Sequence, residues 1–259
     1  MNVSLTHLPK RPKKTRKNGV TMVMDKGLSL RQAEDLIVSA GEYIDFIKLG
    51  FGTSVITSNL AEKIKLYAKA DIKTYFGGTL FEAFLIRDMF DEFCSYLDKY
   101  KIETVEVSDG SIEINHDKKC EYIRKLSENF TVLSEVGSKE EGVIIHPGMW
   151  IKMMNKELDA GSWKVIAEAR ESGTVGIYRS SGHAHTSLVS KITASVKQES
   201  IIWEAPNKKQ QVWWIKQLGA NVNLGNIAPH EAIPLETLRL GLRGDTFFTF
   251  LPKTISKKI

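Results

Sequence analysis

The sequence has very little cysteine: only Cys94 and Cys120 occur among 259 residues. Two cysteines cannot build the disulfide framework of a small secreted domain, and they form no zinc-binding pattern. No apolar run approaches the roughly 18 residues that a membrane-spanning helix needs. The first residues lack the apolar segment of a secretory signal. We therefore expect a cytoplasmic protein that does not associate with membranes.

Acidic residues are absent from both ends of the chain. Residues 1–19 carry six basic side chains and residues 252–259 carry three, and neither stretch contains an acid. The remaining chain has 27 basic and 31 acidic residues, so the formal net charge of +5 comes from the ends. Basic arms can bind nucleic acid. This arm contains Pro9 and Pro12, lacks aromatic residues and adjoins an acidic body, so we interpret 1–19 as a solvated or barrel-bound arm and 251–259 as a basic tail.

Short β-type runs recur along the body of the chain, and most are followed by a stretch with helical spacing of apolar residues. The runs predict strands at 20–24, 44–48, 73–76, 104–107, 131–135, 164–169, 201–204 and 220–224. Ser29 and Gln32 form a capping box before one helix, and Thr79 and Glu82 predict another before a long helix that passes Leu97. Strands alternating with helices predict a parallel sheet. Eight units over residues 20–250 favour a single-domain α/β TIM barrel.

No Gly-x-Gly-x-x-Gly motif follows the first strand, which argues against a dinucleotide-binding fold. The Gly/Ser/His-rich segment 173–187 is long enough to act as a lid over an active site. His183 and His185 lie in this segment and His146 precedes a proline, so the histidines do not form a ligand set for zinc. Trp213 and Trp214 could serve an oligomer interface or pack a helix against the barrel.

Polar residues gather just after the predicted strands, at positions that converge on one face of a barrel. Buried charges there need partners or a bound ion. Carboxylates near lysines indicate a hard divalent ion, which we expect to be Mg²⁺, together with an anionic substrate. Glycines beside hydroxyl residues let backbone N–H groups approach an oxyanion. The candidate site residues are Lys26, Lys48, Gly77, Gly78, Glu106, Ser108, Asp109, Glu135, Lys139, Arg170, Glu171, Glu204, Gly225 and Asn226.

The strand-end motifs together resemble those of the phosphosulfolactate synthase family, which also includes heat-stress-associated proteins of plants. The resemblance spans about residues 9–250. It is carried by the motifs at 25–27, 48–53, 77–82, 108–111, 135–139, 168–173, 204–206 and 223–226. The resemblance implies a Mg²⁺-dependent lyase that adds sulfite to phosphoenolpyruvate and forms (2R)-O-phospho-3-sulfolactate, as in one route to coenzyme M.

The resemblance also suggests roles for the candidate residues. Lys139 resembles the family lysine proposed as proton donor. Catalytic or substrate-charge roles are expected of Lys26, Lys48, Arg170 and Glu171. Metal ligands are expected among Glu106, Asp109, Glu135 and Glu204. Substrate or phosphate contacts are expected of Gly77, Gly78, Ser108, Gly225 and Asn226.

Three alternatives stay open at this point. A different lyase or mutase acting on a phosphorylated enol or 2-oxo acid would need a similar site, because an enolate and an aci-carboxylate require similar stabilisation. A stress-related or interaction protein could retain the fold with a changed role. Binding of nucleic acid through the arm would be salt-sensitive and would disappear without residues 1–19. A homo-oligomer is compatible with each of them.

Overall fold

The computed structural model describes residues 2–137 and 146–255. Parallel strands form one sheet in the order β3-β2-β1-β8-β7-β6-β5-β4, and the end strands β3 and β4 contact each other. The pairing of β1 with β8 joins the first and last strands, so the sheet wraps into a ring, as predicted for a TIM barrel. The strands are β1 Thr21–Asp25, β2 Phe46–Leu49, β3 Lys73–Phe76, β4 Thr104–Val107, β5 Thr131–Val136, β6 Ser162–Ala167, β7 Ile201–Glu204 and β8 Leu224–Ile227.

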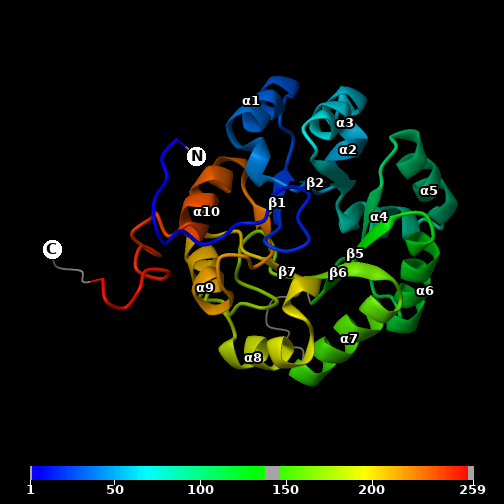
Figure 1. Cartoon of the computed structure of the whole chain (residues 1–259). Coiled ribbons are helices and arrows are strands. Elements are labelled where there is room, and N and C mark those ends of the chain that lie inside the picture. The colour runs from blue at the N-terminus through cyan, green and yellow to red at the C-terminus, as the bar shows by residue number, and fades with distance from the viewer. Residues whose placement is uncertain (1, 138–145, 256–259) are drawn as a thin grey trace.

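Helices surround the ring of strands (Figure 1). They are α1 Leu30–Ala40, α2 Thr53–Ile56, α3 Leu60–Lys69, α4 Gly78–Leu85, α5 Phe90–Lys99, α6 His116–Ser127, α7 Pro147–Asp159, α8 Thr186–Ser195, α9 Lys208–Leu218 and α10 Ala232–Arg239, with 3-10 turns at Gly41–Tyr43, Gln198–Ser200 and Pro229–Glu231. No helix of the described residues is long and apolar enough to cross a membrane.

Two apolar cores hold the barrel together. The large core lies between the strands and the surrounding helices, and includes Tyr67, Trp150 and Trp214. A small core fills the inside of the ring, with Met22 and Phe46 among its members. Successive side chains of each strand point to opposite sides, so β1, β2, β3, β5, β6 and β7 contribute to both cores. This explains why the strands read as continuous apolar runs.

The structure corrects two predicted elements and adds one helix. The predicted long helix after the third strand is two helices, α4 and α5, and Asp88 between them has a left-handed φ of 57°. Helix α8 was not predicted. Strand β8 begins at Leu224 rather than Ala220, because the carbonyls of Ala220 and Val222 accept hydrogen bonds from Arg239 instead of joining the sheet.

The basic arm lies across the amino-terminal end of the barrel (Figure 1). Arg11 forms two hydrogen bonds with the Glu236 carboxylate of α10 and another with Asn221. Arg16 is buried and pairs with Asp45 at 3.1 Å, just before β2. These contacts fix the arm by charge-assisted hydrogen bonds at several points.

The segment proposed as a lid is anchored to its neighbours. The Gln210 amide of α9 donates to the carbonyls of Gly173 and Gly182. The buried hydroxyl of Tyr178 donates to the carbonyl of Glu204 at 2.6 Å and accepts from the Trp214 indole at 2.7 Å. Because Glu204 ends β7, the segment is positioned directly against the carboxyl end of the barrel.

Candidate active site

A cavity of 460 Å³ opens at the carboxyl ends of the strands. Catalytic sites of TIM barrels are built at this end. The residues around it come from strand ends and the loops that follow, so distant parts of the chain meet there. They are Met24, Lys48, Gly50, Phe51, Gly77, Thr79, Ser111, Glu135, Glu168, Arg170, Glu171, Ser172, Glu204 and Asn226.

A lysine surrounded by glutamates forms the floor of this cavity. The ammonium of Lys48, on β2, lies 2.9 Å from a carboxylate oxygen of Glu106, on β4. It lies 3.4 Å from Glu135 on β5 and 3.9 Å from Glu204 on β7. All four side chains are buried. Inward-facing positions of four different strands therefore bring together residues that are far apart in the sequence.

The charges in this cluster shift one another's titration. Burial opposes the charge on Lys48, but Glu106 and Glu135 outweigh it and raise the pKa of the ammonium well above its usual value. Burial raises the pKa of Glu204 to about 7; Lys48 opposes this rise and Glu135 adds to it. Burial likewise raises the pKa of Glu106. These shifts favour the protonated form of Lys48, and they also favour proton binding by Glu204 and Glu106.

Backbone groups orient the carboxylates. Oε1 of Glu106 accepts from the N–H of Gly78 at 2.6 Å. Oε2 of Glu204 accepts from the N–H of Ala169 at 3.0 Å. Oε1 of Glu168, the first residue after β6, accepts from the N–H of Arg170 at 2.7 Å. These bonds fix the positions of the carboxylate oxygens.

The donor set fits a magnesium ion bound through a few protein oxygens. Oε2 of Glu106 is buried and has no hydrogen-bond partner among residues 2–137 and 146–255. Glu135 and Glu204 lie on the other sides of the same ammonium. No three acidic, histidine or cysteine side chains in the described residues converge closely enough to hold a metal by themselves. Mg²⁺ commonly uses one or two carboxylates and completes its shell with water and substrate oxygens.

The rim of the cavity carries further charges. Lys26 pairs with Glu171, and its ammonium lies 6.0 Å from the centre of the Phe51 ring. Arg170 lines the cavity and forms no ion pair within the described part of the chain. Its backbone has a left-handed φ of 49°, which is uncommon outside glycine. The rim thus offers positive charge to an anion entering the cavity.

Glu82 is a structural residue of the site that the sequence did not reveal. It accepts hydrogen bonds from Ser108 and from the N–H groups of Gly110 and Ser111 after β4. The predicted capping box of Thr79 and Glu82 is therefore wrong: α4 begins at Gly78, and the buried Glu82 carboxylate holds the neighbouring loop instead. A helix-capping glutamate and a glutamate that binds a neighbouring loop can share the Thr-x-x-Glu pattern. Only the tertiary contacts distinguish the two roles.

Close packing at Gly78 explains why a glycine stands there. A Cβ atom on Gly78 would clash with Ser108 and lie 2.9 Å from Oε1 of Glu106. Gly77 lines the cavity, whereas Gly78 and Ser108 lie behind it and hold Glu106 and the loop after β4. Gly78 therefore lets α4 approach the end of β4 closely.

Asp109 belongs to a different group of charges. Its carboxylate pairs with the buried ammonium of Lys119, on α6, at 2.9 Å. Lys119 also contacts Glu157 at 2.9 Å and donates to the backbone carbonyl of Glu135 at 2.6 Å. The structure thus places Asp109 in a network behind β5, outside the residues that line the cavity. This network supports Glu135 from the helix side.

The last predicted site residues are Gly225, Asn226 and Lys139. Gly225 and Asn226 lie inside β8, not in a loop after it, because the strand begins later than predicted. Asn226 lines the cavity with a left-handed φ of 56°, whereas Gly225 packs against Met22 of the inner core. Lys139 lies outside the described residues.

The first strand ends at Asp25, and both of its carboxylate oxygens have hydrogen-bond partners. Oδ1 of Asp25 accepts from the N–H groups of Gly27 and Leu28. Oδ2 accepts from the Tyr67 hydroxyl at 3.0 Å and lies 2.9 Å from the buried ammonium of Lys63. Asp25 therefore fixes the turn after β1 to α3.

Residues 9–245 match the (2R)-phospho-3-sulfolactate synthase (ComA) family. The chain belongs to this family. It is 43% identical to a phosphosulfolactate synthase of Bacillus subtilis over 251 residues, which cover 96% of this chain and 100% of the relative. It is 42% identical to a phosphosulfolactate synthase of Methanothermobacter thermautotrophicus over 244 residues, 92% of this chain and 95% of the relative. The resemblance found in the motifs is thereby confirmed, and the family is one of enzymes with small-molecule substrates.

Solved structures support the fold. The chain resembles 3-hexulose-6-phosphate synthase from Salmonella typhimurium with a TM-score of 0.53 and 14% identity, over 86% of this chain and 100% of that structure. It resembles the YdjI aldolase from Escherichia coli with a TM-score of 0.52 and 8% identity, over 90% of this chain and 92% of that structure. At such identities the likeness concerns the barrel alone.

Proposed function

We propose that this phosphosulfolactate synthase family member is a lyase that adds sulfite to phosphoenolpyruvate and forms (2R)-O-phospho-3-sulfolactate. This proposal rests on the buried Lys48, which lies among Glu106, Glu135 and Glu204 on the floor of a 460 Å³ cavity. The family match over nearly the whole chain supports the same reaction.

The reaction joins sulfur to carbon without breaking the phosphate ester. The lone pair of sulfite attacks the methylene carbon, C3, of phosphoenolpyruvate. The electrons of the C2–C3 double bond move toward the substrate carboxylate, which becomes an aci-carboxylate. A proton then adds to C2 on one face. Stabilisation of the growing negative charge lowers the barrier most, because it acts more strongly on the transition state than on the substrate.

The chain's own residues supply positive charge for this intermediate. Lys48 keeps its proton because Glu106 and Glu135 hold its pKa well above the usual value. It can therefore stabilise the aci-carboxylate without giving up the proton. Arg170 and Lys26 at the rim are proposed to attract sulfite and the phosphate group, with Glu171 orienting Lys26. Lys139 remains our proposed proton donor to C2.

One or two carboxylates among Glu106, Glu135 and Glu204 are proposed to hold Mg²⁺, with water and substrate oxygens completing its shell. When bound, the ion would supply a fixed positive charge opposite the substrate carboxylate. Gly77 and Asn226 line the cavity and are proposed to contact the substrate phosphate. Gly78, Ser108 and Gly225 act through packing, and Asp109 through Lys119.

The test is anaerobic incubation of the purified full chain with Mg²⁺, phosphoenolpyruvate and sulfite, with product mass as the readout. The expected product contains the atoms of both substrates and appears only when sulfite is present. Product formed from phosphoenolpyruvate alone would indicate another lyase or mutase. No turnover of either kind would refute the proposal and favour a non-enzymatic role. An R170Q variant should have a higher KM for the substrates than wild type, which would connect turnover with this cavity.

A further inference from the structure

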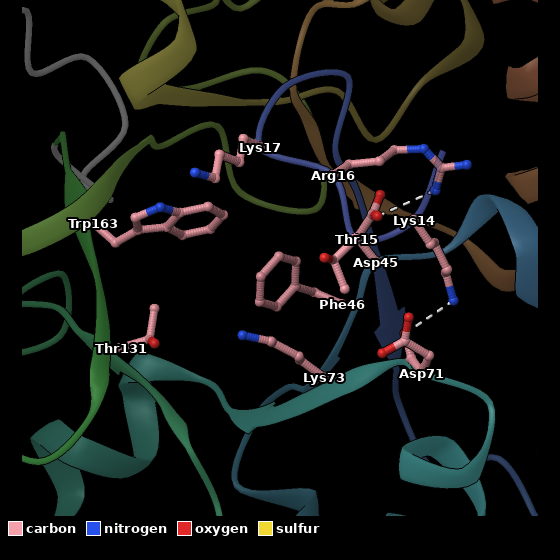
Figure 2. Close-up of a pocket in the computed structure, with 10 residues that line it drawn as sticks. All are labelled: Lys14, Thr15, Arg16, Lys17, Asp45, Phe46, Asp71, Lys73, Thr131 and Trp163. Atoms are coloured by element: carbon pink, nitrogen blue, oxygen red, sulfur yellow. Dashed lines mark hydrogen bonds and ion pairs between the residues drawn. The ribbon is translucent and has the colours of Figure 1, made fainter. Parts of the chain in front are cut away.

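A second cavity lies at the opposite end of the barrel, where the arm crosses the starts of the strands. Its volume is 230 Å³. Lys73 and Thr131 begin β3 and β5, and Phe46 begins β2. Figure 2 shows the side chains that surround it, and nothing in the proposed reaction uses them. The lining residues are Lys14, Thr15, Arg16, Lys17, Asp45, Phe46, Asp71, Lys73, Thr131 and Trp163.

Part of the charge in this basal cavity is already satisfied. The Arg16 guanidinium binds Asp45 and the carbonyls of Pro12 and Glu42. Lys14 donates to the carbonyls of Ala70 and Asp71. The Asp45 carboxylate also accepts from the N–H of Thr21 at 2.8 Å. These groups build the wall of the cavity and bind the arm to the barrel.

Two lysines of the basal cavity have no such partner. Lys17 and Lys73 form no hydrogen bond or ion pair with the residues that the structure describes. In Figure 2 their ammonium groups point toward the space beside Trp163, Phe46 and Thr131. Of the two acids that line the cavity, Asp45 binds Arg16 and Asp71 does not. Asp71 lies beside Lys14. Free positive charge is thus concentrated beside the aromatic rings.

Two aromatic rings make up the apolar wall. Phe46 and Trp163 lie 5.8 Å apart between ring centres, at an angle of 43°. Phe46 is buried, whereas Trp163 is partly exposed. The ammonium of Lys164 lies 4.3 Å from the centre of the Trp163 ring, so a cation also approaches this indole. Aromatic faces next to ammonium groups favour a ligand that is both flat and anionic.

We propose that the basal cavity binds a small anion that carries one flat ring. The ring would pack on Trp163 and Phe46, and Lys17 and Lys73 would bind the anionic group. The volume of 230 Å³ is below the roughly 300 Å³ at which ligand pockets for larger molecules begin, so a single ring with one anionic group fits and a dinucleotide does not. This site is separate from the active site and does not depend on the proposed reaction.

The test measures binding of phenyl phosphate to the full chain by calorimetry and by the fluorescence of Trp163. Replacement of both lysines, in a K17Q/K73Q variant, should weaken binding about tenfold or more, which corresponds to about 1.4 kcal/mol. K13Q removes an exposed charge from the same arm and should change binding less than about twofold. The fluorescence change should disappear in W163F, and R170Q, at the other cavity, should leave binding unchanged.

Cyclohexyl phosphate and inorganic phosphate separate the roles of ring and charge. Cyclohexyl phosphate has the same charge without a flat ring and should bind more weakly than phenyl phosphate. Equal binding of inorganic and phenyl phosphate would overturn the proposal, because charge alone would then suffice. Unchanged binding in K17Q/K73Q, or no binding at about 10 mM phenyl phosphate, would overturn it as well.

Discussion

Replacing Lys48 by methionine removes the cation from three buried glutamates while keeping an unbranched side chain that is one atom shorter. The ammonium lies 2.9, 3.4 and 3.9 Å from carboxylate oxygens of Glu106, Glu135 and Glu204. At an effective dielectric constant of about 20, one such pair at 4 Å is worth about 4 kcal/mol. The energetic cost of burying the charges offsets much of this attraction. Removing one partner of a buried pair nevertheless costs about 3–5 kcal/mol, and we expect a loss of this size for Lys48→Met.

The loss should depend on pH with a definite sign. Without the ammonium, the pKa values of the buried glutamates rise further in the folded state, whereas in the unfolded chain they stay near 4.5. The folded variant then binds more protons than the unfolded one, so its stability falls as pH rises from the unfolded to the folded pKa. The difference from wild type should be small near pH 5 and largest at about pH 8.

Urea unfolding of wild type, Lys48→Met and the exposed control Lys65→Met at both pH values measures this effect. The control should lie within about 0.5 kcal/mol of wild type, as expected for a surface site. A loss for Lys48→Met that is equal at both pH values would show that packing, not charge, explains it. An undiminished stability at high pH would refute the electrostatic account of the cluster.

Three further predictions concern the same end of the barrel. Gly78→Ala should lower kcat/KM at least about tenfold in a steady-state assay, because the added Cβ displaces Ser108 and Glu106; a variant with normal kinetics would contradict this. Gln210→Leu should speed proteolysis near Gly173 and Gly182, as identified by mass spectrometry, and an unchanged cleavage rate would show that the anchoring bonds are dispensable. Mg²⁺ affinity should rise from pH 6 to 8, since Glu204, with a pKa of about 7, must lose its proton to bind a cation; calorimetry checks this, and chelation should abolish turnover.

The barrel and the core of the site follow from local rules that the sequence carries. Apolar strand runs separated by helical segments predict a parallel sheet. Since all parallel strands end at the same face, polar residues at strand ends must meet. This reasoning found Lys48, Glu106, Glu135 and Glu204. In the structure, a carboxylate oxygen of each glutamate lies 2.9 to 3.9 Å from the Lys48 ammonium.

The parts that escaped prediction depend on partners from distant segments. Glu82 has the spacing of a capping residue, yet it is buried against Ser108 and the loop after β4. Asp109 follows the strand-end rule but is bound by Lys119 of the next helix. The start of β8 depends on Arg239, which takes up carbonyls that a strand would need. No local pattern encodes these choices, because each is decided by which buried polar groups find partners.

The closure of the ring has a consequence for the order in which the chain folds. The seam between β1 and β8 joins residues about 200 positions apart, and Arg11 spans it by binding Glu236, 225 residues away. During synthesis, one edge of β1 must wait until β8 has been made, and Arg11 must wait until α10 supplies Glu236. Contacts of such long sequence separation slow folding, and the exposed edge of β1 is vulnerable to mispairing in the meantime. A chain released before Leu224 would therefore keep an open barrel, and Arg11 would lack its partner Glu236.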